Sequence, residues 1–201
     1  MPIKTFQFAA LALVAALTST AALADGVRVR GTVVSLTGDQ LVVKSREGAN
    51  VTIGLGLGWK AGGIAKASLA DIKPGDFVGI ASLPNAAGVA GALEVLIFPP
   101  AMRGTGEGSY GWDLKPNSSM TNGSVSEAVQ SVDGTTVNVV YHGQSKKITI
   151  APGTPIVTFA PAVNADVKPG AVVFVPADRA DDGKLSTTRV VVGKNGIVPP
   201  M

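Results

Sequence analysis

Short runs of Val, Ile and Thr, separated by glycine-containing turns, dominate the pattern of hydrophobic and polar positions along the chain. Residues 27–55, VRVRGTVVSLTGDQLVVKSREGANVTIGL, are interrupted by turn signals at 37–40 and 46–50. Residues 124–150, SVSEAVQSVDGTTVNVVYHGQSKKITI, repeat this arrangement with two turns of the same kind. Alternating β-branched runs bounded by such turns indicate a meander of strands. We therefore predict an all-β fold.

A second pair of similar segments shows that the pattern is duplicated. ADIKPGDFVGIAS at residues 70–82 matches ADVKPGAVVFVPA at residues 165–177, with an offset of 166 − 71 = 95. Gly38 aligns with Gly134 at nearly the same offset, 134 − 38 = 96. Self-similarity at a fixed period indicates an internal duplication.

Each copy predicts five strands with one short helical turn between the third and the fourth. Ser68 is expected to cap that turn in the first copy, and Lys73–Asp76 is expected to form a type II turn around its Pro-Gly pair. The closing strands are predicted at 92–98 and 187–192. This order of elements matches a partly open Greek-key barrel of the OB kind.

The predicted architecture is therefore two tandem small OB-like Greek-key β-barrels that follow a cleaved signal peptide. The signal peptide is expected at 1–24, the first module at 25–98, an ordered connector at 99–123 and the second module at 124–201.

The motifs GTVVSLTG, LVV, VTI and SLADIKPGDFV, all within residues 31–78, resemble a bacterial exported family of OB-like β modules of unknown function. The second copy is similar but looser, with Glu127 in place of the first Gly and Ala171 in place of the Asp after Pro-Gly. The resemblance covers most of residues 27–98 and 123–193. It implies the barrel fold and implies no catalytic residues.

The connector also resembles a recurring segment of tandem proteins of this kind, some of which are associated with metal transport. Ser109 stands where the resemblance implies a His, and Gly111 stands where it implies a Pro. These two departures weigh against a histidine-based metal site in the connector.

The first residues of the chain have the pattern of an export signal. Lys4 precedes an apolar run from Phe6 to Leu17, and Ala22-Leu23-Ala24 fits a signal-peptidase site. The apolar run is too short for a membrane span. We predict a periplasmic or secreted protein with no transmembrane segment after signal cleavage.

Composition narrows the possible partners. The sequence contains no Cys, which excludes disulfides and thiolate chemistry. The formal net charge is +3, and it falls to +2 when Lys4 is removed with the signal. So small an excess does not favour nucleic acid, and the predicted strands carry Val and Thr rather than basic and aromatic residues. We predict no nucleic-acid partner.

The segment MRGTGEGSYGWDLKPNSSMTNG, residues 102–123, has neither helical nor strand periodicity. It contains a Trp, a Tyr and two Met, which flexible linkers rarely carry, so we expect it to be ordered. The favoured interpretation is packing, with Trp112 and Met102 in the seam between the modules. In the alternative, aromatic and charged side chains line a binding groove between the modules: Arg103, Glu107, Tyr110, Trp112 and Asp113.

Formal motifs for nucleotide binding and catalysis fail on their context. Residues 106–111 match G-x-G-x-x-G, but Pro116 follows where a helix would have to grow. The glycines of Gly54–Gly58 are better explained by a bulged or curved strand end. The chain has a single His and no G-x-S-x-G elbow, so we predict that the protein is not an enzyme.

Metal binding is the competing hypothesis. Met102 and Met120 could offer thioethers to Cu(I), with His142 as a further ligand. Met is more often a core residue, and His142 is more simply a solvated turn residue.

The sequence thus predicts an exported, non-enzymatic binding or structural protein of the cell envelope, with its interaction surface at the connector. Its partner would be an unknown envelope component or a small ligand, and no cofactor is expected. The alternative is a periplasmic accessory protein that binds Cu or another divalent metal.

Overall fold

The computed structural model describes residues 26–85, 88–131 and 134–199. The predicted signal peptide lies outside the described residues. In these ranges the chain forms strands and three one-turn 3-10 helices. None of the helices described there is long or apolar enough to cross a membrane.

In the described part of the chain, twelve strands form one continuous hydrogen-bonded network. In chain order, the elements are β1 (Gly26–Thr37), β2 (Gln40–Ser45), β3 (Asn50–Lys66), η1 (Leu69–Asp71), β4 (Phe77–Pro84), β5 (Ala90–Ile97), η2 (Pro100–Met102), β6 (Gly108–Trp112), β7 (Ser118–Ser131), β8 (Gly134–Tyr141), β9 (Gln144–Ile150), β10 (Ile156–Ala160), η3 (Asn164–Asp166), β11 (Val172–Arg179) and β12 (Leu185–Gly193). The predicted all-β fold is confirmed.

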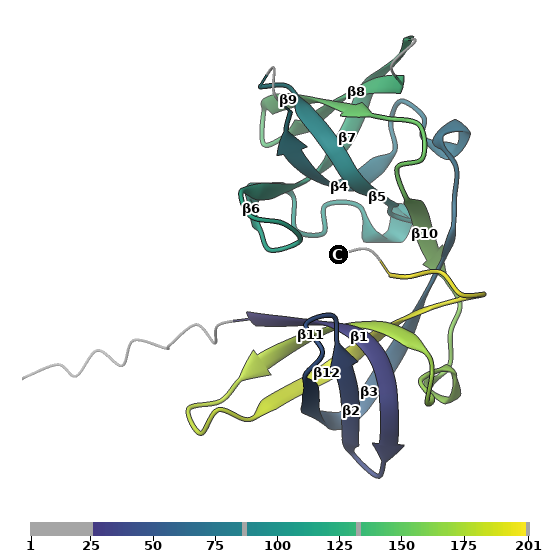
Figure 1. Ribbon diagram of the computed structural model, residues 1–201. Coiled ribbons are helices and arrows are strands. Elements are labelled where there is room, and N and C mark those ends of the chain that lie inside the picture. Colours follow the sequence, from purple (N-terminus) through teal and green to yellow (C-terminus); the bar gives the residue numbers. More distant parts are fainter. Residues whose placement is uncertain (1–25, 86–87, 132–133, 200–201) are drawn as a thin grey trace, which may run out of the picture.

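Five of the strands close a barrel that we call the first lobe, which is the lower lobe in Figure 1. Strand β1 pairs with β2 and β11, β2 pairs with β3, and β11 pairs with β12, all antiparallel. The parallel pairing of β12 with β3 closes the ring. Its core is rich in fully buried aliphatic side chains such as Leu41, Val43, Ile53 and Val190.

A second set of five strands forms the second lobe, which is the upper lobe in Figure 1. Strand β4 pairs with β5 and β7, β7 pairs with β8, and β8 pairs with β9, again antiparallel. A short parallel contact between β5 and β9 closes this ring. Val78, Ile80, Val137 and Ile148 are fully buried in its core.

The barrels are not built from consecutive strands, which differs from the predicted tandem arrangement. Strands β1, β2 and β3 of the first copy close with β11 and β12 of the second copy. Strands β7, β8 and β9 of the second copy close with β4 and β5 of the first. The two copies are alike, so each meander accepts the other's closing pair with the same type of contacts, as in domain swapping. The exchange follows from β3, whose 17 residues carry the chain out of the first lobe.

The two lobes are joined where the chain crosses itself. The end of β3 pairs antiparallel with β10, with Ile64 opposite Phe159. These two residues are separated by 159 − 64 = 95, which is the offset of the duplication. Equivalent residues face each other across a two-fold axis, so the crossing marks an approximate two-fold axis between the copies. A separate apolar cluster that includes Leu96 and Phe174 surrounds it.

The helical turn and the Pro-Gly turn predicted for each copy are both present, but the Ser68 hydroxyl donates to Asp71 instead of accepting from the free amides as the predicted cap would. The Asp71 carboxylate accepts hydrogen bonds from the Ser68 amide at 2.8 Å and from its hydroxyl at 2.7 Å. Asp166 likewise accepts from the Val163 amide at 2.8 Å. The amide of Asp76 donates to the Lys73 carbonyl at 3.0 Å, with Gly75 at φ +94° as a type II turn requires. The two similar sequence segments therefore make similar backbone hydrogen bonds at these turns.

The glycine-rich stretch in β3 forms a bulge within the strand. The register against β12 shifts between Leu55, opposite Thr187, and Lys60, opposite Arg189. Gly58 adopts a φ of +71° there, and Leu57 is fully exposed. The bulge interpretation of the sequence is confirmed, although the bulge lies inside the strand rather than at its end.

Candidate functional site

The connector contains a hairpin that the sequence pattern did not predict. Residues 108–112 form β6, which pairs antiparallel with the start of β7. The buried Ser118 hydroxyl holds the turn. Its oxygen lies 2.7 Å from the Lys115 carbonyl and 3.0 Å from the Trp112 carbonyl, to which it can donate, and it accepts a hydrogen bond from the Lys115 amide at 3.1 Å. The strand lacks apolar alternation because most of its residues are exposed, so periodicity could not reveal it.

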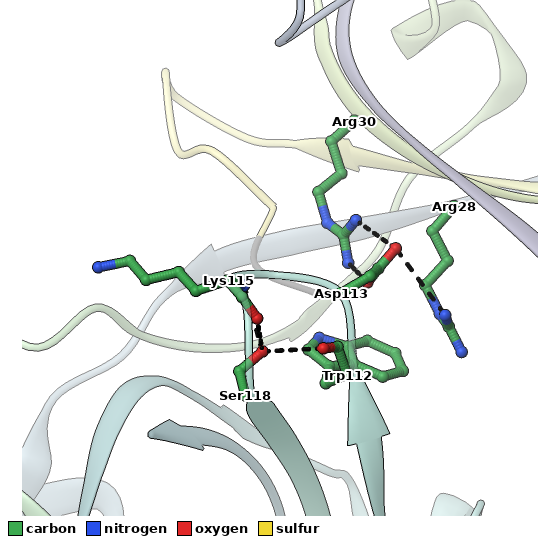
Figure 2. Close-up of polar contacts among 6 residues, drawn as sticks. All are labelled: Arg28, Arg30, Trp112, Asp113, Lys115 and Ser118. Carbon is green, nitrogen blue, oxygen red and sulfur yellow. Dashed lines mark hydrogen bonds and ion pairs between the residues drawn. The ribbon is translucent and has the colours of Figure 1, made fainter. Parts of the chain in front are cut away.

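The tip of this hairpin, which belongs to the second lobe, contacts β1 of the first lobe (Figure 2). The Arg30 guanidinium donates two hydrogen bonds to the Asp113 carboxylate, at 2.8 and 3.2 Å. Arg28 lies 3.8 Å from the same carboxylate, and its guanidinium is 4.0 Å from the centre of the Trp112 ring. We call this group of four residues the latch.

The latch combines a buried cation with a half-exposed anion. The Arg30 side chain is 8% exposed and that of Asp113 is 45% exposed. Burial raises the pKa of Asp113, but the hydrogen bonds and charges of Arg30 and Arg28 outweigh it, so the pKa lies below its usual value. A bidentate arginine–carboxylate pair of this kind fixes the relative orientation of the two side chains and also contributes binding energy. The latch therefore sets the angle at which the hairpin meets the first lobe.

Arg103 and Glu107, which also belong to the predicted connector surface, contact the second lobe instead. Arg103 donates to the Ser124 hydroxyl at 2.9 Å and to the Gly75 carbonyl. Glu107 accepts a hydrogen bond from the His142 amide at 3.0 Å. These contacts hold the connector to the barrel. Arg103 and Glu107 thus lie against the second lobe, whereas Trp112 and Asp113 lie against β1 of the first.

A small cavity of about 60 Å³ lies beneath the hairpin. Tyr110, Trp112, Met120 and Asn122 are among its lining residues. The Asn122 side-chain Nδ2 donates a hydrogen bond to the Tyr110 hydroxyl at 3.2 Å. Its Oδ1 and the Trp112 Nε1 are buried with no hydrogen-bond partner among the described residues. A donor and an acceptor beside a space of this size suit ordered water.

A much larger cavity, of about 640 Å³, lies between the two lobes. It is bounded by the end of β3, η1, the segment between β9 and β10, and residues 196–199, which run between the lobes in Figure 1. Leu114 of the connector lines it, as does Arg30 of the latch. The predicted connector surface thus meets the cavity at these two points.

Sequence reasoning missed most of the residues that line this cavity. Arg46 lies in the turn between β2 and β3, and Lys66 ends β3. Isolated cations at such places are ordinary solvated residues in a sequence. Arg46 and Lys66 line the same cavity only because the chain crosses between the two lobes. No local sequence motif indicates this.

The three candidate metal ligands lie on different elements. Met102 ends η2, Met120 is buried on β7, and His142 lies in the exposed turn between β8 and β9 with a φ of +44°. Within ranges 26–85, 88–131 and 134–199, no group of three or more His, Cys, Asp or Glu residues could hold a metal ion.

Comparison of the chain with protein-family models, with curated proteins and with solved structures found no match in any of the three.

Proposed function

We propose that the protein is an exported, non-enzymatic binding protein, in which two OB-like lobes hold a small ligand in the cavity between them. The observation that carries this proposal is the cavity itself. Its volume of about 640 Å³ lies within the range of roughly 300 to 1,000 Å³ that is usual for small-molecule sites. Sites of this kind form preferentially at interfaces between domains.

The connector supports this proposal through its contacts. Leu114 supplies part of the cavity wall, and the neighbouring Asp113 holds Arg30, which lines the same space. The ligand surface that the sequence placed on the connector would then be the cavity wall beside the latch. The strand order of each lobe, a meander of three closed by two further strands, supports the OB-like assignment.

A neutral environment-sensitive dye, Nile red, tests the proposal. We expect its fluorescence to rise and shift to the blue on mixing with the full mature chain, because the cavity removes the dye from water. Ala151 lines the cavity, so Ala151→Trp should occupy part of the space and abolish the signal.

The matched control is Ala180→Trp, in the exposed turn between β11 and β12. It should bind the dye as the unchanged protein does. An equal signal from both variants, or no signal from the unchanged chain, would refute binding in the cavity.

A further inference from the structure

The cavity exists on one side of the two-fold axis because the two copies have diverged there. At the offset of 95, Leu69 corresponds to Asn164. The Asn164 side chain accepts a hydrogen bond from the Ala61 amide at 3.0 Å and donates to the Trp59 carbonyl at 3.1 Å. These bonds tie η3 to β3. Leu69 can form neither bond, and on its side the corresponding space is the cavity.

Charge in the cavity wall is unevenly distributed. Its lining contains three cations, Arg30, Arg46 and Lys66, and one acid, Glu94. Arg30 is already in a bidentate ion pair with the Asp113 carboxylate. Arg46 and Lys66 form no ion pair with any residue of the described ranges. Among the residues that line the cavity, cations therefore outnumber acids.

The remaining wall is largely apolar. It includes aliphatic and proline side chains from the second lobe and from the C-terminal segment: Leu69, Leu114, Ile156, Ile197, Val198 and Pro199. Such a wall favours a hydrophobic body, because apolar surface removed from water stabilises the complex by roughly 25 cal/mol per Å². A suitable ligand therefore combines an apolar body with one negative charge.

We propose that the cavity binds an amphipathic carboxylate, with the carboxylate at Arg46 and Lys66 and the apolar body against Leu69 and Ile156. This inference rests on the proposed function and adds the chemical class of the ligand. The guanidinium and ammonium groups donate charge-assisted hydrogen bonds to the carboxylate. A hydroxyl head on the same alkyl chain accepts weaker hydrogen bonds because it carries no charge, and an ammonium head is repelled by both cations.

Displacement of Nile red by three ligands with the same alkyl chain tests the ligand class: decanoate, decanol and decylammonium, each below its aggregation concentration. We expect decanoate to bind at least about tenfold more tightly than the other two, since a hydrogen bond to a charged group contributes that much or more. The preference should weaken as salt is added, because both cations are exposed.

Variants assign the head group to its partners. Arg46→Gln and Lys66→Gln should each weaken decanoate binding about tenfold and leave decanol binding unchanged. Lys168→Gln, an exposed cation outside the cavity, should change neither. If Nile red binds but decanol or decylammonium displaces it as well as decanoate, or if neither cavity variant discriminates, the ligand class is wrong while the cavity site stands. Absence of Nile red binding would instead refute the proposed function, and this inference with it.

Discussion

The exchange of strands between the lobes predicts that neither half of the chain folds as a monomer. Cleavage between Gly104 and Thr105, both exposed, separates β1 to β5 from β6 to β12. The first fragment then lacks β11 and β12, and the second lacks β4 and β5. Each lobe loses the two strands that close its ring.

The core of the first lobe gives the size of this effect. Its buried cluster contains thirteen residues in the described part of the chain, and seven of them follow residue 104. Burial of one aliphatic side chain contributes about 1.5 to 3 kcal/mol, so loss of seven removes roughly 10 kcal/mol or more. A whole domain is stable by only about 5 to 15 kcal/mol. The meander cannot remain folded without its closing strands.

The assay compares each fragment alone with an equimolar mixture, by circular dichroism melting and by sedimentation. We expect the mixture to form a one-to-one complex that melts cooperatively, because the mixed fragments restore every strand pairing. Alone, each fragment should be unfolded or should form dimers whose population depends on concentration. A fragment that sediments as a monomer and melts cooperatively would show that the closing strands can fold back on their own meander, which would refute the exchange.

Three further predictions concern the latch and the crossing. Trp112→Ala should lower the free energy of unfolding by about 2 to 3 kcal/mol, less than for a fully buried Trp because this one is part-exposed, and an unchanged melting temperature would show that the hairpin does not pack on β1. Asp113→Asn should lower the melting temperature at pH 7. Because the pKa of Asp113 is lowered in the folded protein, the ionised carboxylate stabilises the fold above the unfolded pKa of about 3.9, and this stabilisation is lost as the pH falls through the folded pKa. The difference in melting temperature between Asp113→Asn and the unchanged protein should therefore vanish in acid. A difference that persists in acid would contradict the ion pair. Gly63→Ala should destabilise the crossing, since its Cβ would lie 2.6 Å from the Ala160 carbonyl oxygen, whereas Gly62→Ala, with open space at its Cβ, is the matched control and should melt like the unchanged protein.

The strands and turns were predictable because their signals are local. Gly38, Gly75 and Gly143 have positive φ, and each lies in a turn that the sequence marked. The pairing of strands was not predictable in the same way. The closing strands of the two copies have similar sequences, so sequence alone does not distinguish a ring closed within one copy from a ring closed across two. Only the path of β3 out of the first lobe decides the partner.

Prediction of the site met the same limit. Trp112 and Asp113 were recognised as unusual residues in a polar segment, but Arg30 lies 83 positions before Asp113. No spacing in the sequence links the two residues. The β6 hairpin was not predicted because most residues of β6 are exposed, so the strand lacks the apolar and polar alternation on which strand prediction depends. The cavity was missed because its cations look like ordinary surface residues until the lobes are assembled.

The place of β12 at the end of the described chain imposes an order on folding. The second lobe has all of its strands once β9 has been made, at residue 150, whereas the first lobe waits for residues 172–193. During vectorial synthesis, the opening meander therefore emerges first and is completed last. Contacts between such distant segments form slowly, because a long loop must close before they can contribute. The first lobe therefore cannot close until residue 193 has been made, although its meander is the first part of the described chain to be synthesised.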